Sequence, residues 1–271
     1  MSTKSTESVD RTMKPILTIA AQLQFGVVQG IAYLPGGERV VTCSRNGAIR
    51  VWNTTTGEEE GAPMDHGDRV DCVAVTKDGK RIMSGGPDKL VKVWDVETHE
   101  VLEEWSGHES SIESMTISPD DELVASGDMN GMVIIREARG GKVKHFMRNL
   151  DGNWGASEVK SLCFSPNGEK VALAHNTGTL RIFEVATGDL VLGPMYCSQT
   201  MSEELYEYWP WHWAFTSLPG LWSLDGRRFF SASDGNTIRT WDTETGDPVG
   251  EPWRGHEESL CRSPSPLTVY A

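Results

Sequence analysis

The densest group of chemically useful side chains lies in one short segment of the sequence. Residues 204–215 read ELYEYWPWHWAF and contain three tryptophans, two tyrosines and one phenylalanine. Aromatic faces at this density can stack on a sugar or another flat ligand, enter a membrane interface, or fill a hydrophobic core. Which of these applies depends on the elements that hold the segment.

Residue types used in catalysis and metal binding occur without a matching pattern. The sequence has no G-x-S-x-G, no glycine-rich phosphate loop, no H-E-x-x-H and no Cys/His set with metal spacing. We therefore predict that the protein is not an enzyme, with no catalytic residues, no metal site and no cofactor.

Composition restricts the partners and the compartment. A formal net charge of −14 disfavours nucleic acid and favours a basic protein partner. No apolar run approaches the roughly 18 residues that span a bilayer, so no membrane association is expected. The five cysteines form an odd, scattered set without a C-x-x-C pair, which is typical of reduced thiols in the cytoplasm or nucleus.

An internal repeat organises the chain. Five segments align without a gap, and in each the first turn residue lies 18 positions before a Trp-like position. The segments are residues 34–53, 76–95, 118–137, 165–184 and 223–242. Each contains turn residues, a short alternating strand, a second turn and another alternating strand. With an apolar strand before and a weaker one after, each unit of about 42 residues predicts four short antiparallel strands.

The repeats resemble the WD-repeat β-propeller family. The resemblance rests on Trp52-Asn53, Trp94-Asp95 and Trp241-Asp242 at the ends of third strands, and on Gly107-His108 and Gly255-His256 before repeats. It implies an all-β fold, a β-propeller of four-stranded antiparallel blades. Five repeats are recognisable, and residues 15–20 (PILTIA) with the segment after Gly255-His256 predict a partial sixth blade.

The domain prediction follows from these repeats. Residues 1–13 are expected to be a disordered tail, and residues 14–271 a single propeller domain. The repeats end near residues 53, 95, 137, 184 and 242, and an insertion covers residues 194–214. The oligomeric state, and whether the ring closes within one chain or with another, are left open.

The resemblance also implies a buried network of His, Ser or Thr, Asp and Trp in each blade. Only the second repeat has the full set, namely His66, Ser84, Asp88 and Trp94. The third keeps His108 and Ser126 but aligns Asn130 and Arg136 with the Asp and Trp. We therefore expect the third blade to be the loosest, because a partly satisfied buried network is destabilising.

The fourth and fifth repeats depart further from this network. The fourth aligns Leu173, Thr177 and Phe183, and the fifth has Ser231 and Trp241 with Gly235 in place of the Asp. The predicted inner-strand triplets 70–72, 112–114 and 159–161 show no repeated carboxylate or His, which also argues against an enzyme site at the channel.

Partner-binding residues are predicted from the same register. In this family the residue before the network Asp tends to point to the face that holds partners, which here indicates Arg45, Pro87, Met129, Asn176 and Asp234. Two insertions, near residues 149–156 and within residues 194–214, are expected to reach that face, and they add Trp154, Tyr206, Tyr208, Trp209 and Trp211. Aromatic and Arg side chains are enriched at interface hot spots.

The predicted function is a non-catalytic scaffold or adaptor that binds protein partners through loops on one face. One alternative is a small-molecule or carbohydrate-binding propeller that uses the Trp-rich insertion. Another is a degenerate or truncated repeat protein without a binding function of its own. In segment 204–215, Phe215 is expected to belong to the core, and membrane insertion is disfavoured beside Glu204 and Glu207.

Overall fold

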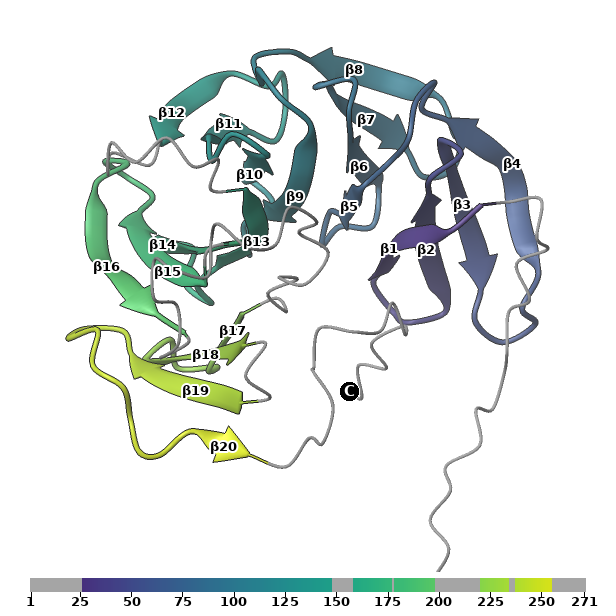
Figure 1. Ribbon diagram of the computed structural model, residues 1–271. Helices are drawn as coiled ribbons and strands as arrows, with labels where there is room; N and C mark the ends of the chain where they lie inside the picture. The colour runs from purple at the N-terminus through teal and green to yellow at the C-terminus, as the bar shows by residue number, and fades with distance from the viewer. Residues whose placement is uncertain (1–25, 148–157, 177, 198–219, 234–236, 255–271) are drawn as a thin grey trace, which may run out of the picture.

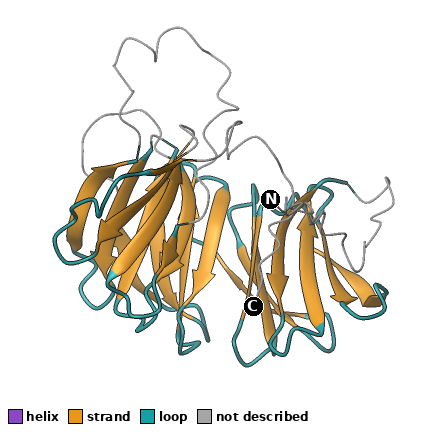
Figure 2. Cartoon of the chain, turned by 90° about the horizontal axis from the view of Figure 1, so that it is seen from below, coloured by secondary structure: helices purple, strands orange, loops and turns teal. Residues whose placement is uncertain are grey.

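Five β-sheets stand around a common centre in the computed structural model (Figure 1). The structure describes residues 26–147, 158–176, 178–197, 220–233 and 237–254. Seen from the side, the strands run steeply between two loop-bearing faces (Figure 2). The first strand of each sheet lies innermost and the fourth outermost, so each sheet forms one blade.

Each blade consists of four consecutive strands. Blade 1 contains β1 (Val28–Tyr33), β2 (Arg39–Ser44), β3 (Ala48–Asn53) and β4 (Glu59–Asp65). Blade 2 contains β5 (Cys72–Val75), β6 (Arg81–Gly85), β7 (Val91–Asp95) and β8 (Val101–Trp105). Blade 3 contains β9 (Ile112–Ile117), β10 (Leu123–Asp128), β11 (Val133–Glu137) and β12 (Val143–Met147). Blade 4 contains β13 (Val159–Phe164), β14 (Lys170–His175), β15 (Thr179–Glu184) and β16 (Leu190–Tyr196). Blade 5 contains β17 (Leu221–Trp222), β18 (Arg228–Ser233), β19 (Thr237–Asp242) and β20 (Trp253–Arg254).

All neighbouring strands within a blade pair antiparallel. The predicted all-β fold of four-stranded antiparallel blades is thus confirmed. The third strands end at residues 53, 95, 137, 184 and 242, which are the repeat ends expected from the sequence. The predicted N-terminal tail and the partial sixth blade lie outside the described residues.

The turn between the first and second strands has the same length and the same side-chain hydrogen bonds in blades 2–5. In blades 2–5 the first turn residue is a hydroxyl that bonds to an Asp or Asn two positions later, as Thr76 Oγ1 does to Asp78 Oδ1 at 2.6 Å. The same hydroxyl accepts the backbone N–H five positions later, at 2.9–3.0 Å. Because these side chains satisfy the turn locally, an insertion here would break the bonds.

In blades 1, 2 and 5 the residue after the tryptophan of the third strand closes the next turn. The Oδ1 atoms of Asn53, Asp95 and Asp242 each accept the backbone N–H groups two and three residues later, at 2.8–3.0 Å. These Asx turns lower the pKa of Asp95 and Asp242, because the backbone N–H groups stabilise the ionised carboxylate. The Trp-Asp and Trp-Asn pairs are therefore turn signals as well as core positions.

The hydrophobic core lies between blades rather than inside one sheet. Four clusters of buried side chains each join two consecutive blades. In the first, Val41 and Ile49 of blade 1 pack with Val70, Ile82 and Trp94 of blade 2. A blade therefore depends on its neighbours for stability, as expected for a repeat fold.

Candidate functional site

The buried polar network of blade 2 joins the four residues expected from the sequence. Ser84 Oγ accepts the indole N–H of Trp94 at 2.8 Å and lies 2.8 Å from His66 Nδ1. His66 Nε2 lies 3.0 Å from Asp88 Oδ2, in a geometry that is off-line for a hydrogen bond. Burial lowers the pKa of His66 below its usual 6.5, although Asp88 opposes this shift. A neutral imidazole with its proton on Nε2 suits both neighbours, which makes the network structural.

The Trp–hydroxyl bond recurs in blades 1 and 5. The indole N–H of Trp52 donates to Thr42 Oγ1, and that of Trp241 to Ser231 Oγ, both at 2.8 Å. In blade 5 the thiol of Cys197 lies 3.4 Å from Ser231 Oγ and fills the position of the His. The hydroxyl and the tryptophan are thus the repeated pair, while the His and the Asp vary.

Blade 3 has the histidine, the serine and a carboxylate of the network, although the carboxylate is not the aligned one. The expectation that blade 3 is the loosest rested in part on the absence of this carboxylate. His108 Nε2 lies 2.8 Å from Ser126 Oγ, and His108 Nδ1 lies 3.0 Å from Asp128 Oδ2. Asp128 is fully buried at the end of β10, whereas the aligned Asn130 is exposed. The carboxylate comes from two residues earlier, and the imidazole is turned around to meet it. The sequence signal for this was Asp128 itself, two positions after the network serine.

The tryptophan position of blade 3 is filled by Arg136. Its side chain is buried, and its guanidinium donates to the carbonyl oxygens of Gly141, at 3.2 Å, and Ser106. Burial lowers its pKa. In blade 4 the equivalent positions carry the apolar Leu173 and Phe183, which pack into the core, and Thr177 lies outside the described residues.

The residues predicted to bind partners from the loops between second and third strands share one edge. The backbone N–H groups of Arg45, Met129 and Asn176 donate to the carbonyl oxygens of residues 27, 111 and 158, at 3.0 Å each. Each acceptor lies just before the innermost strand of the same blade. The loop between the second and third strands is therefore bonded to the innermost strand in the same way in blades 1, 3 and 4. Pro87 has no N–H and cannot make this bond. Arg45 is exposed, and Pro87, Met129 and Asn176 are half-buried. We call the face that carries these loops the loop face.

The other predicted partner-binding residues lie outside the described part of the chain. They are Trp154, Tyr206, Tyr208, Trp209, Trp211 and Asp234. The insertion itself begins later than residue 194, because β16 continues to Tyr196 and Cys197 is buried at the blade 5 network. The continued strand pairing of residues 179 and 180 with 196 and 195 is the reason.

The innermost strands of blades 2–4 carry a charged residue at the same position of the repeat. The prediction that these strands have no repeated carboxylate was wrong for blades 2 and 3. Near the start of the innermost strand a bulge holds one extra residue in blades 3 and 4, between Ile112 and Ser114 and between Val159 and Ser161. The residues at this position are Asp71, Glu113 and Lys160 in blades 2–4. Asp71 and Glu113 are therefore equivalent carboxylates. Each lies five residues before the start of its repeat, at residues 76 and 118, so the sequence contained this signal. Lys160 Nζ lies 3.3 Å from Glu113 Oε2, across the boundary between blades 3 and 4.

Ion pairs hold this charged position in place. Lys160 Nζ also lies 2.6 Å from Glu158 Oε2, and although burial opposes it, the contact with these two carboxylates raises the pKa of the lysine. Arg69 pairs with Asp71 at 2.8 Å, and Ser111 of the next connection donates to the same carboxylate oxygen at 3.4 Å. The rim of the centre on the loop face is thus a row of paired, half-buried charges.

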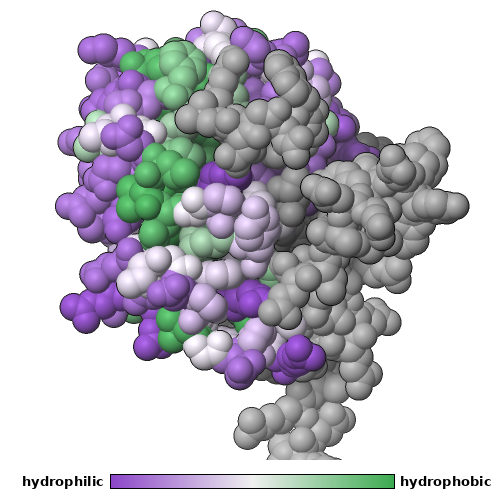
Figure 3. All heavy atoms as spheres, turned by 60° about the vertical axis from the view of Figure 1, so that its left-hand side comes forward, coloured by the Kyte–Doolittle hydropathy of each residue, from purple (hydrophilic) through white to green (hydrophobic). Residues whose placement is uncertain are grey.

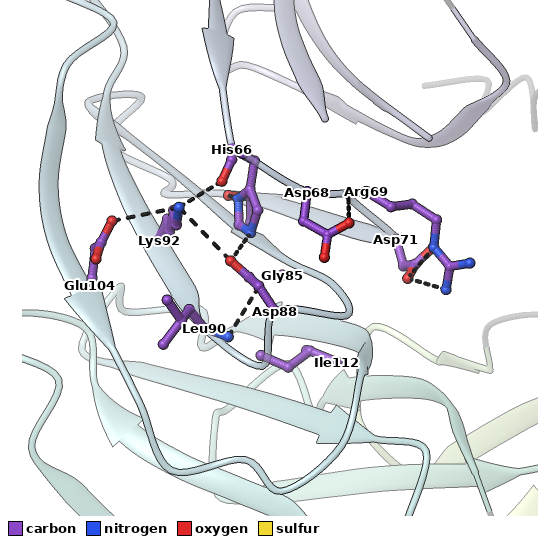
Figure 4. A network of polar contacts seen from close by, with 12 residues as sticks. His66, Asp68, Arg69, Asp71, Gly85, Asp88, Leu90, Lys92, Glu104 and Ile112 are labelled. Atoms are coloured by element: carbon purple, nitrogen blue, oxygen red, sulfur yellow. Dashed lines mark hydrogen bonds and ion pairs between the residues drawn. The ribbon is translucent and has the colours of Figure 1, made fainter. Parts of the chain in front are cut away.

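The connection into blade 2 extends this polar rim outward (Figure 4). Lys92 Nζ donates to the carbonyl oxygen of His66 at 2.6 Å and lies 3.8 Å from Asp88 Oδ2 and 3.6 Å from Glu104 Oε1. Asp88 Oδ1 also accepts the backbone N–H of Leu90 at 3.2 Å. These contacts join the loop that contains Pro87 and Asp88 to β7 and to the connection into blade 2.

A second exposed surface follows the outermost strands. Phe146 on β12 and Leu190, Val191 and Tyr196 on β16 are exposed. Figure 3 shows this side of the molecule, with hydrophobic residues lying among hydrophilic ones. These four side chains lie on the outermost strands and face solvent. They are separate from the loops of the loop face.

Metal ligands and reactive thiols were considered for the part of the chain that the structure describes. In that part, no group of three or more His, Cys, Asp or Glu could hold a metal ion. Burial raises the pKa of the Cys43 thiol to about 12 and that of Cys163 to about 11, so neither is a thiolate nucleophile at neutral pH. No helix in the described part of the chain has the length and apolarity to cross a membrane.

Four-stranded antiparallel blades arranged around a centre define a β-propeller-type repeat protein. Comparison with family models identifies the repeat family. The model described as WD domain, G-beta repeat matches residues 13–53, 62–95 and 99–136. The model described as anaphase-promoting complex subunit 4 WD40 domain matches residues 118–202. The chain therefore belongs to the WD-repeat family, whose members serve in general as protein-interaction scaffolds and are typically not enzymes. No curated protein gave a significant match to the chain.

Proposed function

We propose that the protein is a non-catalytic scaffold that binds protein partners through its loop face. The observation that carries the proposal is the equivalent placement of Arg45, Met129 and Asn176, whose backbone N–H groups make the same bond in three blades. A rigid frame presents these side chains around one centre, so little ordering free energy is lost on binding.

The charges on the loop face favour a partner with basic groups. Asp71, Glu113 and Glu158 supply three carboxylates at the rim, against the cations Arg69 and Lys160. With a formal net charge of −14 for the whole chain, long-range attraction also favours a basic partner. Arg45 and the half-buried Met129 would provide anchors of the types enriched at hot spots.

The family and the thiols support this role and its setting. The match to a WD40 domain described for a subunit of the anaphase-promoting complex is a likeness to a domain that works inside an assembly. No disulfide joins the cysteines in the described part of the chain, which supports a reducing compartment, cytoplasmic or nuclear. The mechanism is recognition only, with no chemical step assigned to this face.

Quantitative affinity capture from the native cells tests the proposal. The tagged full chain is compared with Arg45→Glu/Met129→Glu, which changes the loop face. The matched control is Lys142→Glu, which changes an exposed residue in the turn at the opposite end of β11.

We expect the double substitution to reduce recovery of the specific partners at least about tenfold, which corresponds to about 1.4 kcal/mol. The control should recover the same partners as the original chain. Equal losses, or no loss in the double variant, would remove the loop face as the binding surface.

A further inference from the structure

Asparagine followed directly by glycine occurs three times in the sequence, at Asn46-Gly47, Asn130-Gly131 and Asn167-Gly168. In such a pair the backbone nitrogen of the glycine can attack the side-chain amide of the asparagine, because glycine has no side chain to hinder the approach. All three pairs lie in turns, two of them between a second and a third strand and one between a first and a second strand. Each pair is therefore a candidate for spontaneous loss of ammonia.

The backbones of the three turns are alike. The N–H groups of Gly47, Gly131 and Gly168 each donate to the carbonyl oxygen three residues earlier, at 3.1, 3.1 and 2.9 Å. The three glycines also share a positive φ, of 87°, 77° and 75°. The asparagines before them are all exposed. Differences in reactivity then depend on how each side-chain amide is held.

The side-chain amide of Asn167 is held by three hydrogen bonds. Its Oδ1 accepts the hydroxyl of Ser165 at 2.7 Å and the backbone N–H of Glu169 at 3.2 Å. Its Nδ2 donates to the carboxylate of Glu169 at 2.6 Å. The amide carbon can turn toward the nitrogen of Gly168 only after these bonds break, which slows the reaction.

The side-chain amide of Asn46 is held in a similar way. Its Oδ1 accepts the hydroxyl of Ser44 and the backbone N–H of Ala48, the latter at 3.3 Å. Asn46 thus closes its own turn through its side chain, in the manner of an Asx turn. The same bonds keep its amide carbon away from the nitrogen of Gly47.

The equivalent turn of blade 3 is closed by an aspartate instead. At equal distances from the repeat starts, Asp128 is equivalent to Ser44, and Asn130 to Asn46. Asp128 Oδ1 accepts the backbone N–H groups of Asn130 and Met132, at 2.9 and 3.0 Å. The second of these is the N–H that the asparagine itself holds in blade 1.

This exchange releases the side chain of Asn130. A carboxylate oxygen and an amide oxygen are both acceptors, so Asn130 Oδ1 can bond neither to Asp128 nor to the N–H group that Asp128 already holds. The described residues form no hydrogen bond with the Asn130 side chain. Its amide carbon is therefore free to approach the nitrogen of Gly131.

We propose that Asn130-Gly131 is a site of spontaneous deamidation. The backbone N–H of Gly131 gives its proton to water, and the nitrogen forms a bond to Cγ of Asn130. The bond from Cγ to the amide nitrogen breaks, and that nitrogen takes a proton from water and leaves as ammonia. A second water molecule opens the resulting succinimide and yields aspartate or isoaspartate. Water is the only co-reactant, and no group is oxidised or reduced.

Either product changes blade 3 at the loop face. Aspartate places a new carboxylate between Met129 and Gly131, close to the buried Asp128. Isoaspartate adds a methylene to the backbone inside the turn that the carbonyl oxygen of Asp128 and the N–H of Gly131 close at 3.1 Å. Loss of that bond weakens the turn that holds Asp128 against His108. The modification is thus a slow, irreversible change in the blade.

The test follows the three pairs side by side in the full chain. The folded protein is kept at physiological temperature and mildly alkaline pH, which favours loss of the glycine proton, and is sampled over weeks. Digestion and peptide mass spectrometry give the converted fraction of each asparagine. The pairs at Asn46 and Asn167 are matched controls within the same molecule, and a parallel time course in denaturant measures the three rates without the turns.

We expect Asn130 in the folded chain to convert at least about fivefold faster than Asn46 or Asn167, because each of the other two amides first breaks two or more hydrogen bonds. In denaturant the three rates should be similar. A rate at Asn130 that does not exceed the other two in the folded chain overturns the assignment. A lead of Asn130 that persists unchanged in denaturant also overturns it, because the turns would then not be the cause.

Thermal unfolding of the incubated protein tests the effect on blade 3. The original chain should lose Tm during the incubation, whereas Asn130→Gln should keep it, because the longer side chain forms the cyclic imide far more slowly. Equal loss in both chains, or no loss in the original chain, contradicts the effect. This inference goes beyond the proposed function, and both measurements use the chain alone, so failure of the loop-face proposal leaves them unaffected.

Discussion

Replacing Ser84 by Ala removes one hydroxyl oxygen that serves two buried partners. Ser84 Oγ accepts the indole N–H of Trp94 and lies within hydrogen-bond distance of His66 Nδ1, at 2.8 Å in both cases. Ser84 and His66 are 0% exposed and Trp94 is 3% exposed. Water therefore cannot replace the lost partner without rearrangement of the blade.

The size of the effect follows from counting the polar atoms left without partners. Each buried donor or acceptor that loses its partner costs about 1–3 kcal/mol, so the loss of both in Ser84→Ala should cost about 2–6 kcal/mol. In blade 1 the equivalent Thr42 Oγ1 accepts one bond, from Trp52. The isosteric Thr42→Val should therefore cost about half as much.

Thermal unfolding followed by far-ultraviolet circular dichroism measures both variants. At about 2–4 °C per kcal/mol for a chain of this size, Ser84→Ala should lower Tm by about 4–24 °C. Ser106→Ala, at an exposed serine, is the control and should leave Tm unchanged. If Ser84→Ala lowers Tm no more than Thr42→Val does, the shared hydroxyl is not the centre of the network and the reasoning is refuted.

Three further predictions follow from the buried positions. Trp94→Ala should cost about 3–5 kcal/mol and appear as a folding defect in a melt, because a large aromatic leaves the blade core; a variant as stable as the original chain would contradict the register. Asp128→Ala should destabilise by about 3–5 kcal/mol in urea unfolding, while Asn130→Ala changes stability by less than about 0.5 kcal/mol; the reverse order would restore Asn130 to the network. Since burial lowers the pKa of His66 in the folded state, the unfolded chain binds the proton first, and Tm should fall as pH drops below about 6.5. His66→Gln should flatten that part of the profile, and an unchanged slope would exclude His66 as a source.

Much of the fold was predictable because local bonds fix the repeat length. The turn hydroxyls at Thr76 and its equivalents, and the Asx turns at Asp95 and its equivalents, both depend on residues close in sequence. The hydroxyl bonds fix the length of the first turn in blades 2–5, and the second and third strands of every blade pair without a bulge, which keeps the 18-residue spacing constant. Contacts between blades depend on residues distant in sequence, and one sequence alone does not reveal them.

The candidate site was predictable only in part. The loop positions Arg45, Met129 and Asn176 follow from the register, and the structure places them alike. Asp128 was missed because its carboxylate reaches His108 from the strand rather than from the loop, after a turn of the imidazole. The pairing of Lys160 with Glu113 was missed because Glu113 comes from the preceding blade, 47 residues earlier in the sequence.

Hydrogen–deuterium exchange of the full chain, alone and bound to a partner recovered by affinity capture, tests the central claim most directly. If the protein is a scaffold that binds through its loop face, amides near Arg45, Met129 and Asn176 should exchange more slowly in the complex. Amides in the turns at the opposite end of the strands, such as residues 138–142, should be unchanged. Protection confined to those opposite turns or to the outermost strands would contradict the account.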